Sequence, residues 1–296
     1  MFNENSIVYQ NGEFVVAKDA NTNLFSQTLH YGIGVFEGMR SYPTQDGPPV
    51  IFKLEEHLNR LFYSSARMGI QLNVSLEDLK TACNELLRKN RLSNAYIRPL
   101  VYLGRNMSFR KNVKAHVFIA AWQWGKLFGD DLLNVGISTY RKQSPKSIII
   151  DAKVVGHYTN SSLATNEAVA NGFDSAILLD ENGFVAQGAA ANFFYERDNV
   201  LYTPMTNNIF PGITRQTIID LAGTLNISVE EKNISLEELE LADAAFFTGT
   251  AAEVSGIKSI GNNDMGYKWE DSSSYFISCK YHQLVRQQDI HQSTFI

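Results

Sequence analysis

The sequence predicts an α+β protein of two domains, and three observations lead to this expectation. Its 296 residues are about twice the length of a typical domain. Asn-Gly dipeptides join short apolar-rich runs, which is typical of antiparallel hairpins. Two amphipathic helical patterns follow one another without a strand between them, so the chain lacks the strict strand-helix alternation of a parallel sheet.

Residues 1–125 predict a small α+β domain with the order ββααββ. The dipeptide Asn11-Gly12 is the strongest short-range signal for a two-residue hairpin turn. The expected elements are a hairpin over residues 6–16, helices that begin at Leu54 and after Ser75, and strands over 96–102 and 117–122. Residues 30–40 are rich in glycine and aromatic side chains without a clear period, which predicts either a pocket wall or a buried loop.

The periodicity breaks over residues 126–131, so a linker is expected there and a second domain over 132–296. In this domain the two hairpin patterns predict antiparallel β structure. The expected elements are an extended segment over 148–155, a helix over about 161–171 before Gly172, hairpins over 176–186 and 193–202, a helix after Pro211-Gly212, and a helix capped by Ser235 and Glu238.

Composition narrows the classes of partner. Lys and Arg total 26 against 31 for Asp and Glu, and without a basic run this net charge of −5 disfavours nucleic acid. Residues 1–6 do not resemble a targeting signal, and no apolar stretch approaches the roughly 20 residues of a membrane span. Cys83 and Cys279 are too few for a disulfide framework or a paired zinc site. The sequence therefore predicts a cytoplasmic protein with no metal site.

Lys153 is the first candidate for chemistry, because apolar residues surround it between Ile148 and Val155. Desolvation favours a neutral amine, and a neutral amine can attack a carbonyl to form a Schiff base. The alternative is a lysine on an edge strand, whose stem covers apolar surface while its ammonium group reaches water. The local sequence leaves both possibilities open.

Three further segments could bind anions. Residues 210–215 and 247–253 combine small residues, threonine hydroxyls and exposed amides that could hold a phosphate or a carboxylate, although plain structural turns look the same. Arg98 lies in a strand-like run with Tyr96 on the same side, so the pair could hold a carboxylate or form a polar outer face. The sequence lacks zinc-binding His spacing and a serine-hydrolase elbow.

Six motifs occur in one order that resembles the class IV aminotransferases, most closely the branched-chain amino acid aminotransferases. The likeness extends from about residue 6 to about residue 285. The motifs are His30-Tyr31-Gly32 with Phe36-Glu37-Gly38-x-Arg40, Glu56-His57-x-x-Arg60-Leu61, Tyr96-Ile97-Arg98-Pro99, Lys153-x-x-Gly156-x-Tyr158, Pro211-Gly212-Ile213-Thr214-Arg215 and Gly249-Thr250-Ala251-Ala252-Glu253.

The resemblance implies a fold type IV enzyme that uses pyridoxal 5'-phosphate (PLP) to move amino groups between branched-chain L-amino acids and 2-oxoglutarate. It implies a small α+β domain, a larger β-barrel-like domain with helices, and an active site between them that a partner subunit completes in a homodimer or higher homo-oligomer. By the same resemblance, Lys153 forms the Schiff base and moves the proton, Tyr158 bonds the ring oxygen, and Arg60, Thr250 and the Ile213 and Thr214 amides hold the phosphate.

The resemblance also implies the substrate contacts. Tyr96 with the Thr250 and Ala251 amides binds the α-carboxylate, Arg98 with Tyr31 binds the side-chain carboxylate of glutamate, and Phe36, Tyr31, Trp124 and Tyr158 accept the apolar side chain.

Gln187 departs from the family pattern, which has a glutamate opposite the pyridine nitrogen. A carboxylate keeps that nitrogen protonated, whereas an amide can only hydrogen-bond, so a slower or altered transaminase is expected. The alternatives are a D-amino acid aminotransferase, an aminodeoxychorismate lyase-like enzyme, or a weakly active PLP-binding relative.

Overall fold

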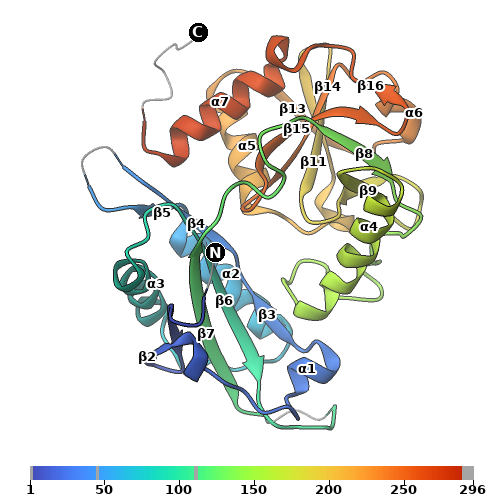
Figure 1. The fold of residues 1–296 in the computed structure, drawn as a ribbon. Helices are drawn as coiled ribbons and strands as arrows, with labels where there is room; N and C mark the ends of the chain where they lie inside the picture. Colours follow the sequence, from blue (N-terminus) through green and yellow to red (C-terminus); the bar gives the residue numbers. More distant parts are fainter. Residues whose placement is uncertain (1–2, 45–46, 110–112, 289–296) are drawn as a thin grey trace. The chain divides into compact units, whose positions relative to one another are not determined.

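The computed structural model describes residues 3–44, 47–109 and 113–288. The chain forms two compact units, one of Met1–Gly125 with Asp151–Tyr158 and one of Lys126–Ile150 with Thr159–Ile296 (Figure 1). The second unit begins inside the segment predicted as a linker. The units are also not continuous in sequence. Residues 151–158 lie within the range expected for the second domain but pack in the first unit.

Backbone hydrogen bonds hold this returning segment in the first unit. The carbonyl of Lys153 accepts from the Phe36 amide at 3.0 Å, and the Gly156 amide donates to Gly32 at 3.0 Å. The extended strand expected over 148–155 is wrong, because turns and one isolated bridge at Val154 replace it. The segment is apolar enough for a strand, but its backbone groups pair with residues far away in sequence.

Within the described residues, the first unit contains a seven-stranded antiparallel sheet in the order β2-β1-β7-β6-β4-β5, with β3 paired to β6. The strands are β1 (Ile7–Gln10), β2 (Glu13–Val16), β3 (Gly34–Phe36), β4 (Met39–Tyr42), β5 (Val50–Ile51), β6 (Ala95–Leu103) and β7 (Ala115–Gln123). The hairpin at Asn11-Gly12 is confirmed, with φ of 53° and 103° at its two turn residues. The segment 30–40, expected as a pocket wall or a buried loop, holds the end of α1 (Gln27–Tyr31), the strand β3 and the beginning of β4.

Both predicted helices of this unit are confirmed as α2 (Leu54–Arg67) and α3 (Leu76–Asn90). They contact each other, and α3 also contacts β1 and β7. A capping box between Ser75 and Asp78 begins α3 by satisfying amides that its first turn leaves unpaired. The buried face of α3 packs Leu79, Cys83 and Leu86 into the core.

The described part of the second unit contains a nine-stranded sheet in the order β10-β9-β8-β15-β14-β11-β12-β13, with β16 paired to β15. The strands are β8 (Leu133–Ile137), β9 (Ser175–Leu179), β10 (Val185–Gly188), β11 (Asn192–Arg197), β12 (Val200–Pro204), β13 (Ser228–Lys232), β14 (Ala244–Gly249), β15 (Glu253–Ile260) and β16 (Asn263–Asp264). Both predicted hairpins are confirmed, but the sheet is mixed, because β8 runs parallel to β9 and β15, and β12 parallel to β13.

The sheet of the second unit curls until its ends meet. The amide of Val185 on the terminal strand β10 donates to the carbonyl of Ile234, which follows the opposite terminal strand β13, at 2.8 Å. The interior is an apolar core that includes Phe193, Phe247 and Ile257. This architecture is the barrel-like sheet that the resemblance implied.

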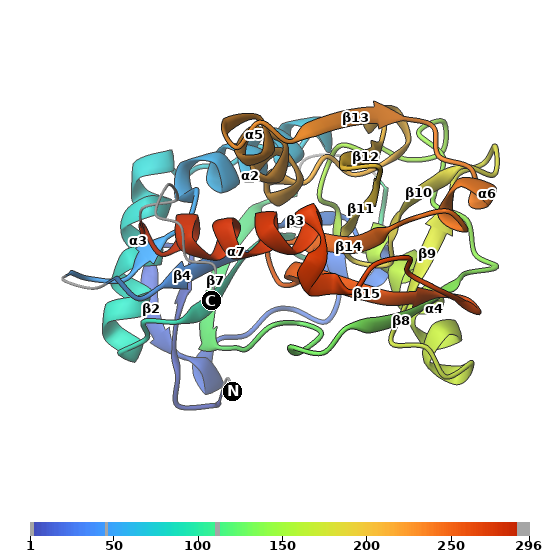
Figure 2. The ribbon, with the colours of Figure 1, turned by 90° about the horizontal axis from the view of Figure 1, so that it is seen from above.

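Helices cover the curled sheet on its outside. They are α4 (Tyr158–Ala170), α5 (Ile213–Thr224), α6 (Leu236–Leu239) and α7 (Ser273–Val285), and α5 and α7 contact each other and β14 (Figure 2). Short 3₁₀ turns lie at Ala17–Asp19, Val155–His157, Thr206–Asn208 and Trp269–Asp271. In the described part of the chain, every helix is too short or too polar to cross a membrane.

Candidate active site

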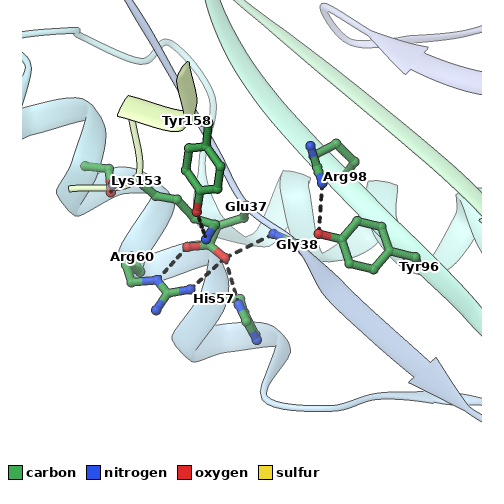
Figure 3. A network of polar contacts seen from close by, with 9 residues as sticks. Glu37, Gly38, His57, Arg60, Tyr96, Arg98, Lys153 and Tyr158 are labelled. Carbon is green, nitrogen blue, oxygen red and sulfur yellow. Dashed lines mark hydrogen bonds and ion pairs between the residues drawn. The ribbon is translucent and has the colours of Figure 1, made fainter. Parts of the chain in front are cut away.

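Lys153 lies in the returning segment of the first unit, and contacts fix both its backbone and its side chain. Its amide donates to Ser64 Oγ at 3.0 Å, and its amine donates to the Tyr158 hydroxyl at 2.7 Å (Figure 3). Lys153 Nζ also lies 5.1 Å from the ring centre of Phe36 and 5.2 Å from that of Tyr158. The amine is therefore held against two aromatic rings rather than extended into water.

The surroundings change the protonation of this pair. Burial and, to a lesser extent, the Arg60 charge lower the pKa of the Lys153 amine to about 8, against the opposing effect of Glu37. Burial raises the pKa of the Tyr158 hydroxyl to about 12. At neutral pH, Tyr158 is thus a neutral phenol beside an amine that loses its proton far more easily than a free lysine does. Of the two interpretations that the sequence left open, the structure favours the desolvated amine.

Arg60 on α2 lies in the same region and pairs with a buried carboxylate. Its Nε donates to Glu37 Oε1 at 2.6 Å, and one terminal nitrogen donates to Glu37 Oε2 at 3.0 Å (Figure 3). His57, one helical turn before Arg60, places Nδ1 2.8 Å from Oε2 of the same carboxylate. Glu37 is fully buried, and Arg60 and His57 hold its pKa well below the usual range although burial alone would raise it.

Arg98 on β6 lies among aromatic rings of the same unit. Its guanidinium carbon lies 4.7 Å from the Phe36 ring centre and 5.2 Å from that of Tyr96, and one terminal nitrogen donates to the Tyr96 hydroxyl at 3.0 Å. Tyr96 also meets Trp124 edge to face at 4.9 Å. Arg98 Nε is buried and has no hydrogen-bond partner among the described residues. A buried donor without a partner is suited to an anionic ligand.

Tyr31 has other contacts. Its hydroxyl donates to the Met107 carbonyl at 3.1 Å, and its ring lies 4.7 Å from that of Phe109. The expected contact of Tyr31 and Arg98 with the side-chain carboxylate of glutamate stays a prediction, because each of them contacts other residues in the chain without that ligand.

Gln187 lies on β10 in the second unit, where its orientation is fixed by a neighbour. Its Oε1 accepts the Phe210 amide at 3.0 Å, and its Nε2 lies 3.3 Å from the carbonyl of Gly188. Because a backbone amide can only donate, the side-chain amide must turn its oxygen toward Phe210. The NH₂ group of Gln187 is therefore the end that can meet a ligand.

Small residues and the uncapped amides of a helix N-terminus lie near Gln187. Asn192 donates to the Phe210 carbonyl at 2.9 Å, and Asn192 Oδ1 lies so close to Gly212 that a Cβ there would clash at 2.1 Å. The helix α5 begins after Gly212 without a side-chain cap, so the amides of Ile213 and Thr214 lie in its first turn without one. Uncapped amides at a helix N-terminus attract anions.

The turn that contains Thr250 and Ala251 joins β14 to β15 in the same unit. It follows directly on Thr248, which pairs with Asn192 across the two strands. The second unit therefore places Asn192 between the predicted phosphate-binding end of α5 and this turn. The hydroxyl of Thr248 is buried and has no hydrogen-bond partner in the described part of the chain.

Comparison with known proteins identifies the family. The model of the family "Amino-transferase class IV" matches residues 34–260. The chain belongs to the class IV aminotransferases. Branched-chain-amino-acid aminotransferases from Pseudomonas aeruginosa and Escherichia coli K12 are 41% and 39% identical to it, over 90% and 88% of this chain and 88% and 86% of theirs.

Solved structures agree with this assignment. The branched-chain aminotransferase of Thermoproteus uzoniensis with norvaline has a TM-score of 0.92 at 34% identity and covers 96% of each chain. The branched-chain amino acid aminotransferase of Thermobaculum terrenum in its PLP-form has a TM-score of 0.89 at 29% identity, over 97% of this chain and 96% of that one. The names of these relatives favour the branched-chain activity over the D-amino acid and lyase alternatives.

Glu37 and His57 lie within two of the class IV motifs, but neither had a predicted role. The spacing of His57 and Arg60 contained a usable signal, because residues three apart on a helix lie on the same face and can share a partner. The partner itself, Glu37, lies 20 residues before His57 in the sequence and was not predictable from a local pattern.

Proposed function

We propose that this protein uses PLP to transfer amino groups between branched-chain L-amino acids and 2-oxoglutarate. The observation that carries the proposal is the Lys153 amine, with its pKa lowered to about 8, held 2.7 Å from the Tyr158 hydroxyl. When bound, PLP supplies an aldehyde carbon that reacts with amines and a ring that withdraws electrons from the substrate α-carbon.

The residues fit this cofactor. Lys153 offers an amine with a large neutral fraction near neutral pH, which the reaction with an aldehyde requires. Tyr158 stays protonated and can donate to the ring oxygen. For the phosphate we propose the Arg60 guanidinium, Thr250 and the amides of Ile213 and Thr214.

In the reaction, the side chain of Lys153 would have two tasks. Its Nζ would hold the cofactor, and when free it would take the proton from the substrate α-carbon. A nitrogen whose pKa lies near the working pH can both accept and return a proton. The Tyr158 hydroxyl positions Nζ between these tasks.

The substrate contacts follow from the two substrates. We propose that Tyr96 with the Thr250 and Ala251 amides binds the α-carboxylate, and that Arg98 binds the second carboxylate of glutamate. Arg98 lies against the Phe36 and Tyr96 rings, so one surface offers an aromatic face to leucine and a cation to glutamate. Tyr31, Trp124 and Tyr158 complete the proposed apolar side.

For assembly, we propose a homodimer that buries the apolar surface formed by residues 24–31 and 106–109. On this surface Leu24, Phe25, Leu29, Met107 and Phe109 are each at least half exposed. The two segments form one patch, since the Asn106 amide donates to Phe25 O. An exposed patch of this kind marks an interaction site. Sedimentation of a Leu24→Ser, Phe109→Ser double variant should show monomer where the native chain shows dimer.

We also propose a reducing compartment, the cytoplasm, because Cys83 and Cys279 are both free thiols.

A half-reaction tests the proposed activity. PLP-loaded protein mixed with L-leucine, without any 2-oxo acid, should lose the absorbance of the aldehyde form of the cofactor and gain that of the amine form. Addition of 2-oxoglutarate should restore the first spectrum, and D-leucine should leave it unchanged. If L-leucine has no effect, the proposed function is wrong, and a response to D-leucine alone would favour the D-amino acid alternative.

A further inference from the structure

Glu37 is the one carboxylate at the centre of the site in the described part of the first unit, and the reaction outlined above gives it no task. Its side chain is completely buried and accepts hydrogen bonds from Arg60, His57 and its neighbour Gly38, whose amide donates at 3.2 Å (Figure 3). Burying a carboxylate costs several kcal/mol unless its partners compensate. Such an arrangement needs an explanation in stability or in function.

We propose that Glu37, held in place by His57, is a positioning residue that fixes the guanidinium of Arg60 for the cofactor phosphate. The inference rests on the proposed function, because it takes PLP as the ligand of Arg60.

The contact between Glu37 and Arg60 fixes both the position and the orientation of the guanidinium. Both oxygens of Glu37 are used, at 2.6 Å to Nε and 3.0 Å to one terminal nitrogen of Arg60. A guanidinium is planar, so this two-point contact sets its plane and turns the edge that carries the other terminal nitrogen away from Glu37. A phosphate at that edge would meet donors whose orientation is set before it binds.

His57 gives the carboxylate its own orientation. Burial is the main cause that lowers the pKa of the His57 imidazole, so the ring is neutral and Nδ1–H can donate to Glu37 Oε2 without adding a charge. His57 and the Gly38 amide both contact Oε2, whereas Nε of Arg60 contacts Oε1. His57 therefore orients the carboxylate of Glu37, and Glu37 in turn orients the guanidinium of Arg60.

A purely structural ion pair is the competing explanation. The pair joins α2 to the loop between β3 and β4, and a buried pair could serve that junction alone. The two explanations differ in one respect. A structural defect weakens the binding of every cofactor form alike, whereas a misdirected Arg60 weakens the binding of forms that carry a phosphate.

The test compares the dissociation constants of pyridoxamine 5'-phosphate and pyridoxamine for the full chain, freed of PLP. Both ligands lack the aldehyde, so the bond to Lys153 plays no part, and they differ in the phosphate alone. Glu37→Asp keeps the charge but shortens the reach by one methylene. We expect it to reduce the preference for the phosphorylated ligand about tenfold and to change pyridoxamine binding less than about twofold.

Glu85→Asp is the matched control. Glu85 also contacts Arg88 through Nε and a terminal nitrogen, at 3.2 and 2.7 Å, but on the exposed face of α3. This variant should bind both ligands as the native chain does.

His57 supplies a second pair of variants should Glu37→Asp not fold. His57→Leu removes the donor to Glu37 and should reduce the phosphate preference about threefold, whereas His57→Asn keeps a donor near the position of Nδ1 and should restore most of it. An unchanged phosphate preference in the folded members of the set, or an equal loss for both ligands, would overturn the positioning role. If the native chain itself shows no phosphate preference, the proposed function fails instead, so the two failures are distinguishable.

Discussion

The two units carry different kinds of candidate groups. In the first unit, Lys153, Arg60 and Arg98 are charged or titratable, and each donates a hydrogen bond to a side chain of the same unit. In the second unit the candidate groups are the Gln187 amide, small residues and backbone amides, without a charged side chain among them. The electrostatic part of the chemistry is thus concentrated in the first unit, while the second offers neutral donors.

This difference predicts unequal sensitivity to mutation. Removal of a charged group inside a buried network changes both the charge and the partners left behind, which is costly. Replacement of a neutral donor removes one hydrogen bond, worth about 1 kcal/mol.

Lys153→Ala should reduce the rate of transamination about 10⁴-fold, because it removes both the attacking amine and the proton carrier. After reduction with borohydride, peptide mass mapping should find the cofactor on Lys153 in the native chain and nowhere in the variant. Lys146→Ala is the control, since Lys146 is 82% exposed and pairs with Glu181 at the surface. Labelling of another lysine in the fully loaded native protein would contradict the assignment.

The lowered pKa of Lys153 predicts the pH dependence of cofactor attachment. Attachment needs the neutral amine, whose fraction rises about tenfold between pH 7 and pH 9 for a pKa of about 8. The rate of PLP attachment to cofactor-free protein should rise over this range and then level off, as followed by stopped-flow absorbance. With a free lysine, whose pKa is about 10.4, the attachment rate would still rise at pH 10. A pH profile of that form would contradict a desolvated amine.

Local sequence signals predicted the elements whose cause is local. The Asn11-Gly12 turn and the capping box of Ser235 with Glu238 act within four residues, and both are present as expected. The strands β3 and β4 and the irregular path around Lys153 were not predicted, because their pairing depends on β6 and on Phe36, far away in the sequence. Propensity cannot report such partners.

The same limit applies to the site. The apolar surroundings of Lys153 in the sequence suggested a desolvated amine, and its lowered pKa agrees. The resemblance supplied the proposed roles of Arg60, Tyr158 and Gln187, which remain predictions. The Glu37 contact with Arg60 and His57 became visible in the folded chain, because the loop between β3 and β4 has to meet the helix α2 before that carboxylate has partners.

Gln187→Glu should raise the turnover number roughly fivefold, since a charged hydrogen bond to the pyridine nitrogen stabilises the electron-withdrawing form of the ring more than a neutral one does. A glutamate can accept the Phe210 amide with one oxygen as Gln187 does and offer the other to the ring, at the loss of the 3.3 Å donation from Nε2 to the Gly188 carbonyl. Gln123→Glu, at an exposed position on β7, adds the same charge as a control. An unchanged or lower rate would count against the proposed role of residue 187.

The smallest expected effect concerns two buried threonines of the second unit, which differ in whether the hydroxyl has a hydrogen-bond partner. Thr203 on β12 and Thr248 on β14 are both fully buried, and Thr203 donates to the Phe193 carbonyl at 2.8 Å. The Thr248 hydroxyl has no such partner among the residues that the structure describes. Thr248→Val should therefore raise the free energy of unfolding of the cofactor-free protein by about 1 kcal/mol, because it removes an unsatisfied buried hydroxyl.

Thr203→Val should lower the same quantity by about 1 to 2 kcal/mol, because it leaves a buried carbonyl without its donor. Urea denaturation of the two variants measures both effects in one series. If both substitutions destabilise the cofactor-free protein alike, then the Thr248 hydroxyl is satisfied within the chain and is not held in reserve for a ligand. A gain at Thr248 that disappears when PLP is bound would place that hydroxyl among the neutral donors of the second unit.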